Sequence, residues 1–260
     1  MRESQSNTKQ LFAEIERSKA NGKKRDFVSE FRELAERAGI RYRFEFEEEN
    51  LPDMPTVVVS NHFIRHWWDK RSLHLGRTFG KTWDSMIVAG VISTGAAEGP
   101  TKGKGTSWLI KDKIRTHIGP IPLKEKQMQS TFIEVYDHIP VSVPKKEEGI
   151  TPGIVAGVQF ARTLTYIRNH LARGKNIGLY AEGDNPGQMK MDSAPLATLL
   201  KSFRKRKIGN LQVIPASVCW ENGEFKVHYS KAIQAGEDYK TDAQSVIQAI
   251  AAKLPPSLKV

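Results

Sequence analysis

The 260-residue sequence is poor in cysteine, in long apolar runs and in acidic side chains. Its single cysteine, Cys219, lies in the apolar run VIPASVCW, so no internal disulfide can form and a reducing compartment is expected. No stretch approaches the roughly eighteen consecutive apolar residues of a membrane-spanning helix. The first ten residues, MRESQSNTKQ, lack the apolar segment of a secretion signal. We therefore expect a cytoplasmic protein that does not cross a membrane.

The shortage of acidic residues leaves the chain strongly basic. The sequence has 40 Lys and Arg residues against 29 Asp and Glu, which gives a formal net charge of +11. Such an excess favours polyanionic partners, namely nucleic acid, an anionic lipid surface or a phosphorylated substrate. The basic clusters are short and scattered, and no helix-turn-helix, zinc-finger or RNA-binding signature accompanies them. Charge therefore indicates a class of partner but not one partner.

The N-terminal region is predicted to be helical. Residues 8–38 read as two polar amphipathic helices separated at Asn21-Gly22, and the second ends at Gly39. Its apolar stripe fits either core packing or contact with a membrane surface and consists of Phe27, Phe31, Leu34 and Ala38.

Strand and helix patterns alternate through the rest of the chain. Expected strands cover residues 40–46, 56–60, 107–111, 177–181, 211–220 and 224–229, and expected helices cover 84–92, 154–173, 194–206 and 242–253. Residues 132–152 contain three prolines and read as an exposed insertion. The alternation predicts an α/β fold with a mixed, mostly parallel sheet flanked by helices. We expect a short N-terminal helical segment over residues 1–45 and the α/β domain over 46–260.

Two expected strands end in residues that can carry chemistry. Asn61-His62 directly follows the buried strand TVVVS, and Glu182 follows the strand in LYAEGDNPG. Ligand chemistry in α/β folds is usually built at the carboxyl ends of strands, and a histidine there can act as a general base. Each also has a structural interpretation, since a strand-end histidine can be buried and Asp184–Gly187 can form a β-turn.

Together with their surroundings, these segments resemble the glycerophosphate/lysophosphatidate acyltransferase superfamily. The first motif is similar to Glu49–Pro52 followed by Val57–His62, and the third to Gly174–Gly183. Lys111–Leu123 resembles the second motif and Val213–Ser217 the fourth, while Ala194–Ala197 lies where the helix after the third motif begins. The four motifs come in the family's order over residues 46–220.

The sequence departs from the family's motifs at two points. The family places an aspartate five residues after the histidine, but position 67 is Trp, so Asp84 or Asp69 would have to take that role. Asp84 is favoured because it leads into the apolar run 85–92, which makes 63–83 an insertion. The third motif has Asn185 where the family has a phosphate-binding arginine.

The resemblance implies transfer of a fatty acyl group from acyl-CoA or acyl-carrier-protein, as co-substrate, to the hydroxyl of a glycerophosphate or lysophospholipid-type acceptor. His62 would be the base and Asp84, or alternatively Asp69, its carboxylate partner. The implied substrate-binding residues are Asn61, Lys124, Glu182, Gly183 and Lys190. No metal or further cofactor is expected. The lipid product implies peripheral attachment to an anionic membrane surface.

Three alternatives remain open on the residues alone. His62 and His66 have the spacing of zinc ligands on a helix, but position 63 is Phe where the metalloprotease motif has Glu. The aromatic and basic segment 67–83 could stack on nucleic acid, contact lipid or pack in the core. The altered motifs also allow an acyltransferase fold without activity.

Overall fold

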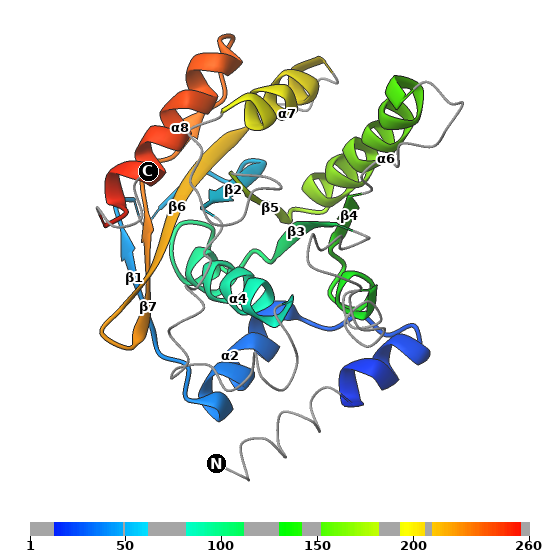
Figure 1. Cartoon of the computed structure of the whole chain (residues 1–260), viewed down its shortest axis with the longest axis vertical. Coiled ribbons are helices and arrows are strands. Elements are labelled where there is room, and N and C mark those ends of the chain that lie inside the picture. Colours follow the sequence, from blue (N-terminus) through cyan, green and yellow to red (C-terminus); the bar gives the residue numbers. More distant parts are fainter. Residues whose placement is uncertain are drawn as a thin grey trace.

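The computed structural model describes residues 13–48, 50–61, 82–111, 130–141, 152–181, 193–205 and 210–255. Its centre is a sheet in the order β1-β7-β6-β2-β5-β3-β4, with β8 beside β6 (Figure 1). The strands are β1 (Tyr42–Phe46), β2 (Thr56–Ser60), β3 (Thr106–Lys111), β4 (Ile139–Val141), β5 (Asn176–Tyr180), β6 (Gln212–Glu221), β7 (Glu224–Tyr229) and β8 (Ile233–Gln234). All neighbours pair in parallel except β7 and β8 with β6, which confirms the predicted mixed, mostly parallel sheet.

Helices cover both faces of this sheet. The helices α2 (Phe27–Ala38) and α4 (Thr82–Glu98) share one apolar cluster, and α6 (Pro152–Ala172), α7 (Ala194–Lys205) and α8 (Tyr239–Lys253) share the other. The central strand β2 serves both clusters, because Val58 belongs to the first and Val57 and Val59 to the second. This two-sided burial explains why TVVVS carries no apolar–polar alternation.

The N-terminal helices form as predicted, and α2 packs into the core. Helical residues 13–20 end at a turn over 21–22, and the Asp26 side chain accepts a hydrogen bond from the Val28 amide at the start of α2. Gly39 ends α2 in the left-handed conformation, with φ of 65°. Phe27, Phe31 and Leu34 are buried in the first cluster. Of the two interpretations of this stripe, core packing is therefore confirmed.

The helix α4 fits between α2 and the sheet because glycines allow close approach. An added Cβ at Gly90 would collide with the Phe31 ring of α2, and one at Gly95 would collide with Phe44 and Tyr229 on the sheet side. The Tyr229 hydroxyl donates to the carbonyl of Ile92 at 2.5 Å. The helix runs from Thr82 to Glu98, which is longer than the predicted 84–92.

The prediction that 132–152 is an exposed insertion is wrong for its described part. Residues 130–135 are helical, with Phe132 and Val135 buried, and Ile139–Val141 forms β4. The prolines misled the prediction because they occupy permitted positions: Pro140 lies in an edge strand and Pro152 starts α6. Residues 142–151 lie outside the described residues.

The predicted boundary between residues 45 and 46 stays a prediction. It falls inside β1, whose residues pair with β7 from Tyr42↔Phe225 to Phe46↔Tyr229.

Over the ranges that the structure describes, no helix combines the length and the apolar character needed to cross a membrane.

Candidate functional site

The two strand ends singled out by sequence meet at one edge of the sheet. The strands β2 and β5 are parallel neighbours, with Ser60 opposite Tyr180. One step further, the Ala181 amide donates to the Ser60 carbonyl at 2.7 Å. The chain therefore leaves β2 at Asn61 and β5 at Ala181 in adjacent positions, and His62 and Glu182 are the next residues of each segment.

Asn61 fixes the end of β2 to the neighbouring strand β6. Its side-chain Nδ2 donates to the Val218 carbonyl at 2.9 Å, and its Oδ1 accepts from the Val218 amide at 2.7 Å. Backbone pairing between β2 and β6 ends at Ser60↔Ala216. The side-chain amide of Asn61 adds one further step to this ladder, because it bonds both backbone polar groups of Val218. Asn61 is 4% exposed and Val218 is fully buried. These two bonds hold the backbone from which His62 follows.

The first turn of α4 lies at this same edge. The segment after its last turn lies at the opposite edge, because Thr101 Oγ1 accepts a hydrogen bond from the side chain of Asn176 at the start of β5 and Lys104 forms an ion pair with Asp53. Asp53 precedes β2, so α4 runs against the parallel strands and begins where they end. Asp84 falls in the first turn of α4.

A packed aromatic layer supports the edge from the α4 side. The Trp108 ring of β3 covers Gly178 of β5 and lies 5.0 Å from the Tyr180 ring, measured between ring centroids. Its Nε1–H donates to Ser93 Oγ of α4 at 2.8 Å. Trp108 thereby joins β3, β5 and α4 directly beneath the point where β5 ends, and Gly178 is required because any Cβ there would enter the ring.

The structure places some of the predicted site residues and leaves the others outside the described residues. Asn61 is positioned with its side chain, and Asp84 by its place in α4. The remaining predicted residues lie outside the described ranges and are His62, Asp69, Lys124, Glu182, Gly183 and Lys190. Both polar atoms of Asn61 are engaged with Val218, so its contribution is to hold the backbone. The substrate-binding role predicted for Asn61 and the roles assigned to the others stay predictions.

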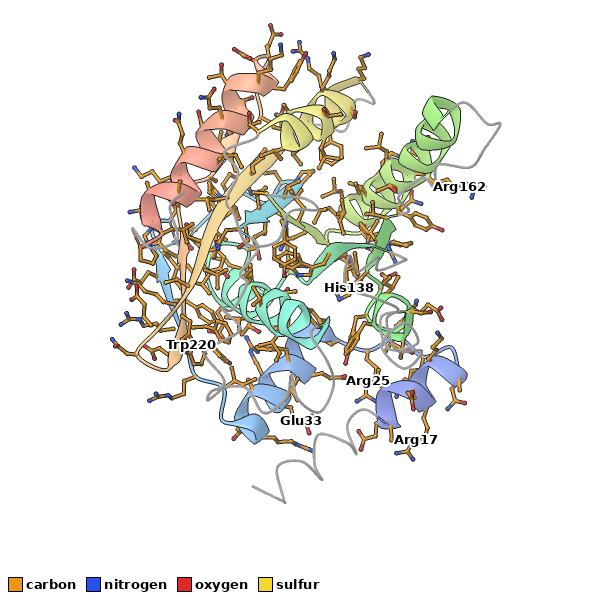
Figure 2. All side chains as sticks on the ribbon, in the orientation of Figure 1. Arg17, Arg25, Glu33, His138, Arg162 and Trp220 are labelled. Carbon is orange, nitrogen blue, oxygen red and sulfur yellow. The ribbon has the colours of Figure 1, made fainter. Side chains whose placement is uncertain are left out.

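A second titratable cluster, which the sequence did not reveal, lies at the opposite edge. Asp137 precedes β4 and pairs with Lys175 at 2.8 Å and Arg173 at 3.1 Å, with His170 Nε2 3.8 Å away. Next to it His138 is buried and accepts from the Trp108 amide through Nδ1 (Figure 2). Burial lowers the pKa of His138 to about 3 and that of His170 to about 4, so both are neutral at pH 7. Their positions indicate a structural role.

Nothing in the described part of the chain supplies a metal centre. Those residues contain no group of three or more His, Cys, Asp and Glu side chains that could hold an ion, while His62 and His66 lie outside them. Cys219 is buried, and burial raises the pKa of its thiol to about 11. A protonated, buried thiol is a poor nucleophile.

Comparison with known proteins adds one likeness of fold. No protein-family model matches the chain, and no curated protein matches it either. Among solved structures it is similar to the 1-acyl-sn-glycerophosphate (LPA) acyltransferase PlsC from Thermotoga maritima, with a TM-score of 0.47 and 15% sequence identity. The match covers 97% of this chain and 83% of that one. A likeness at this level assigns no role to any residue here.

Proposed function

We propose that the chain is an O-acyltransferase that moves a fatty acyl group from a thioester to the hydroxyl of a glycerophosphate or lysophospholipid-type acceptor. The observation that carries the proposal is the convergence at one sheet edge. Asn61, which precedes His62, and Ala181, which precedes Glu182, are adjacent there. The direction of α4, from Ser93 beside Trp108 to Thr101 beside Asn176, carries its first turn with Asp84 toward the same edge. This arrangement supports our proposal that two of the sequence motifs that resemble the acyltransferase family, together with the favoured aspartate, form one site.

Strand alternation supports the pairing of His62 with Asp84. In β2, Val58 packs in the cluster that contains α4, and in β5 Gly178 and Tyr180 contact Trp108, which is bonded to α4. Even-numbered positions of both strands thus face α4. We propose that His62 and Glu182, which follow these two strands in sequence, act on the side of the sheet that α4 covers.

In the proposed reaction, one His62 ring nitrogen removes the proton from the acceptor hydroxyl as its oxygen attacks the thioester carbonyl. The tetrahedral intermediate collapses with cleavage of the carbon–sulfur bond, and the imidazolium returns the proton to the departing thiolate. Asp84 accepts a hydrogen bond from the other ring nitrogen, which fixes the tautomer and stabilises the imidazolium. No acyl-enzyme is formed, so no nucleophilic Ser or Cys is needed.

The partners follow from the charges of the two substrates. We propose acyl-CoA or acyl-carrier-protein as donor, with Glu182 and Gly183 lining the acceptor site and Lys124 and Lys190 binding its phosphate. Donor and acceptor are both anionic, in keeping with the net charge of +11. The lipid product also leads us to propose reversible attachment to an anionic membrane surface.

Acceptor-dependent thiol release tests the proposal. Purified protein is incubated with acyl-CoA or acyl-carrier-protein and with glycerol 3-phosphate or lysophosphatidate, and free thiol is measured with and without the acceptor. We expect release that requires both substrates. Absence of release with every pair would contradict enzymatic acyl transfer, and salt-sensitive binding to generic DNA or RNA in the same preparation would favour the nucleic-acid alternative.

A further inference from the structure

The strand β1 forms one edge of the sheet. It pairs in parallel with β7, and within the described ranges no strand lies on its other side (Figure 1). The Phe225 amide of β7 donates to the Arg41 carbonyl, so the odd-numbered residues of this segment direct their backbone groups toward β7. The backbone groups that point away from β7 are therefore those of Tyr42, Phe44 and Phe46. Such an edge can pair with a strand of another chain.

The side chains of β1 form two rows of different character. One row is aromatic, is only partly buried and packs against the first apolar cluster, and it consists of Tyr42, Phe44 and Phe46. The other row is charged and lies on the opposite face of the strand, in the order Arg41, Arg43, Glu45 and Glu47. The side chains of Arg43 and Glu45 are 48% and 44% exposed. Basic residues thus precede Phe44 and acidic residues follow it.

This order of charges is complementary to itself in an antiparallel pair. If two copies of β1 meet about a twofold axis at Phe44, Arg43 of each copy lies opposite Glu45 of the other, and Arg41 lies opposite Glu47. Opposite charges directly across from each other stabilise strand pairing. A shift by two residues would instead place Arg43 opposite Arg43, or Glu45 opposite Glu45. Charges on an edge strand usually keep other chains away, but here their order favours one partner and one register.

The backbone and the aromatic row fit the same register. Phe44 of one copy faces Phe44 of the other, and Tyr42 faces Phe46. All three residues direct their amides and carbonyls away from β7, so these groups meet one another as the hydrogen-bonded pairs of an antiparallel ladder. The aromatic side chains meet on one face of the joined sheet, where their partly exposed rings would be buried further.

The ion pairs between β1 and β7 are compatible with this arrangement. Arg43 pairs with Glu224 at 3.3 Å and Glu45 with Lys226 at 3.2 Å, both on the β7 side of the strand. A second copy would approach from the other side. Each charged side chain of β1 would then lie between opposite charges on both neighbouring strands.

We infer that β1 is a self-association surface, through which two copies of the chain join their sheets edge to edge. The shared strand pair is short, so the dimer forms weakly and its population depends on protein concentration. The inference is independent of the proposed acyl transfer, because β7 and β6 separate β1 from β2 and β5, whose ends form the candidate site.

Sedimentation velocity at protein concentrations from about 1 to 200 μM tests the inference. We expect the wild type to change from monomer to dimer over this range. Arg43→Glu alone and Glu45→Arg alone each place like charges opposite each other twice, so each should weaken self-association at least about tenfold. An equimolar mixture of the two variants restores both opposite-charge pairs and should restore the dimer. Arg204→Glu, which reverses an exposed charge on α7, is the matched control and should dimerise like the wild type.

Urea unfolding midpoints show whether the variants are folded, since each reversal also disturbs an ion pair with β7. If either is unfolded, Arg43→Cys combined with Glu45→Cys provides a second test. In the proposed register these positions face each other with Cα atoms about 4.5 Å apart, within the range of a disulfide. Oxidation should therefore link two chains covalently, whereas Arg204→Cys should give no such product.

Loss of the dimer in each single variant and its return on mixing would support the inference, as would the specific covalent dimer. A wild type that stays monomeric at every concentration would overturn it. A dimer that persists unchanged in both folded single variants would also overturn it, because another surface would then join the chains.

Discussion

Replacing Asn61 with alanine should cost far more stability than removing an exposed asparagine. The substitution deletes the acceptor of the Val218 amide and the donor to the Val218 carbonyl, at 2.7 and 2.9 Å. Val218 is fully buried in the sheet, so neither backbone group gains free access to water. A buried backbone group left without a partner costs about 1–3 kcal/mol, and the two together give an expected loss of about 2–6 kcal/mol.

Urea unfolding followed by tryptophan fluorescence measures this loss. The midpoint should fall with little change in slope, because the surface exposed on unfolding stays nearly the same. Asn169→Ala is the matched control, since Asn169 is exposed on α6 and should change the free energy of unfolding by less than about 0.5 kcal/mol.

A companion variant, Asn61→Asp, separates hydrogen bonding from volume. The carboxylate keeps an acceptor for the Val218 amide but turns a second oxygen toward the Val218 carbonyl, which then lacks a donor. Relative to the wild type at the same pH, the variant should lose more stability at pH 7 than at a pH that protonates the carboxyl group. If Asn61→Ala loses no more stability than Asn169→Ala, the clamp between β2 and β6 is refuted.

Three further outcomes follow from the structure. Gly178→Ala should destabilise the protein by about 1–3 kcal/mol, because the added methyl group would collide with the Trp108 ring. Gly105→Ala, which has open space around it, should be close to neutral. Thermal unfolding compares the two variants, and equal effects would contradict the packing of Trp108 on Gly178. Stability should decline as pH falls below about 6.5, because the pKa values of His138 and His170 are lowered to about 3 and about 4 and the unfolded chain therefore binds protons first. His138→Phe should flatten that decline in urea titrations at successive pH values, and an unchanged slope would rule out a contribution from His138. Asp84→Asn should reduce acyl transfer much more than Asp69→Asn in the thiol-release assay, and the reverse ranking would make Asp69 the partner of His62.

Local sequence patterns were sufficient to predict most elements of the fold. The run TVVVS, the stop at Gly39 and the stop at Gly174 each depend on short-range physics, namely β-branched burial and positive φ at glycine. The prediction for 132–152 failed because its prolines were taken to exclude regular structure. The sequence did not show that Pro140 lies in an edge strand, where proline is permitted. Pro215 did not mislead the prediction in this way, since the strand expected over 211–220 forms as β6 (Gln212–Glu221) with Pro215 inside it. It is tolerated there because β6 changes partner from β8 to β7 at that point.

The candidate site could be predicted only in part, because its residues are adjacent through strand register. Asn61 and Glu182 are far apart in sequence, and only the pairing of Ser60 with Tyr180 brings their segments together. The bonds from Asn61 to Val218 have no local sequence signal, since they depend on which strand lies beside β2. The same holds for His138, whose burial results from its place between β3, α2 and α6.

The rate of acceptor-dependent thiol release in His62→Ala tests the proposed mechanism most directly. His66→Ala serves as control, because it removes a histidine from the same segment. Loss of a general base typically lowers the rate about 10²–10⁴-fold, and we expect this for His62→Ala with an unchanged circular dichroism spectrum and unfolding midpoint. We expect His66→Ala to retain activity. Near wild-type release by a folded His62→Ala protein would contradict the account.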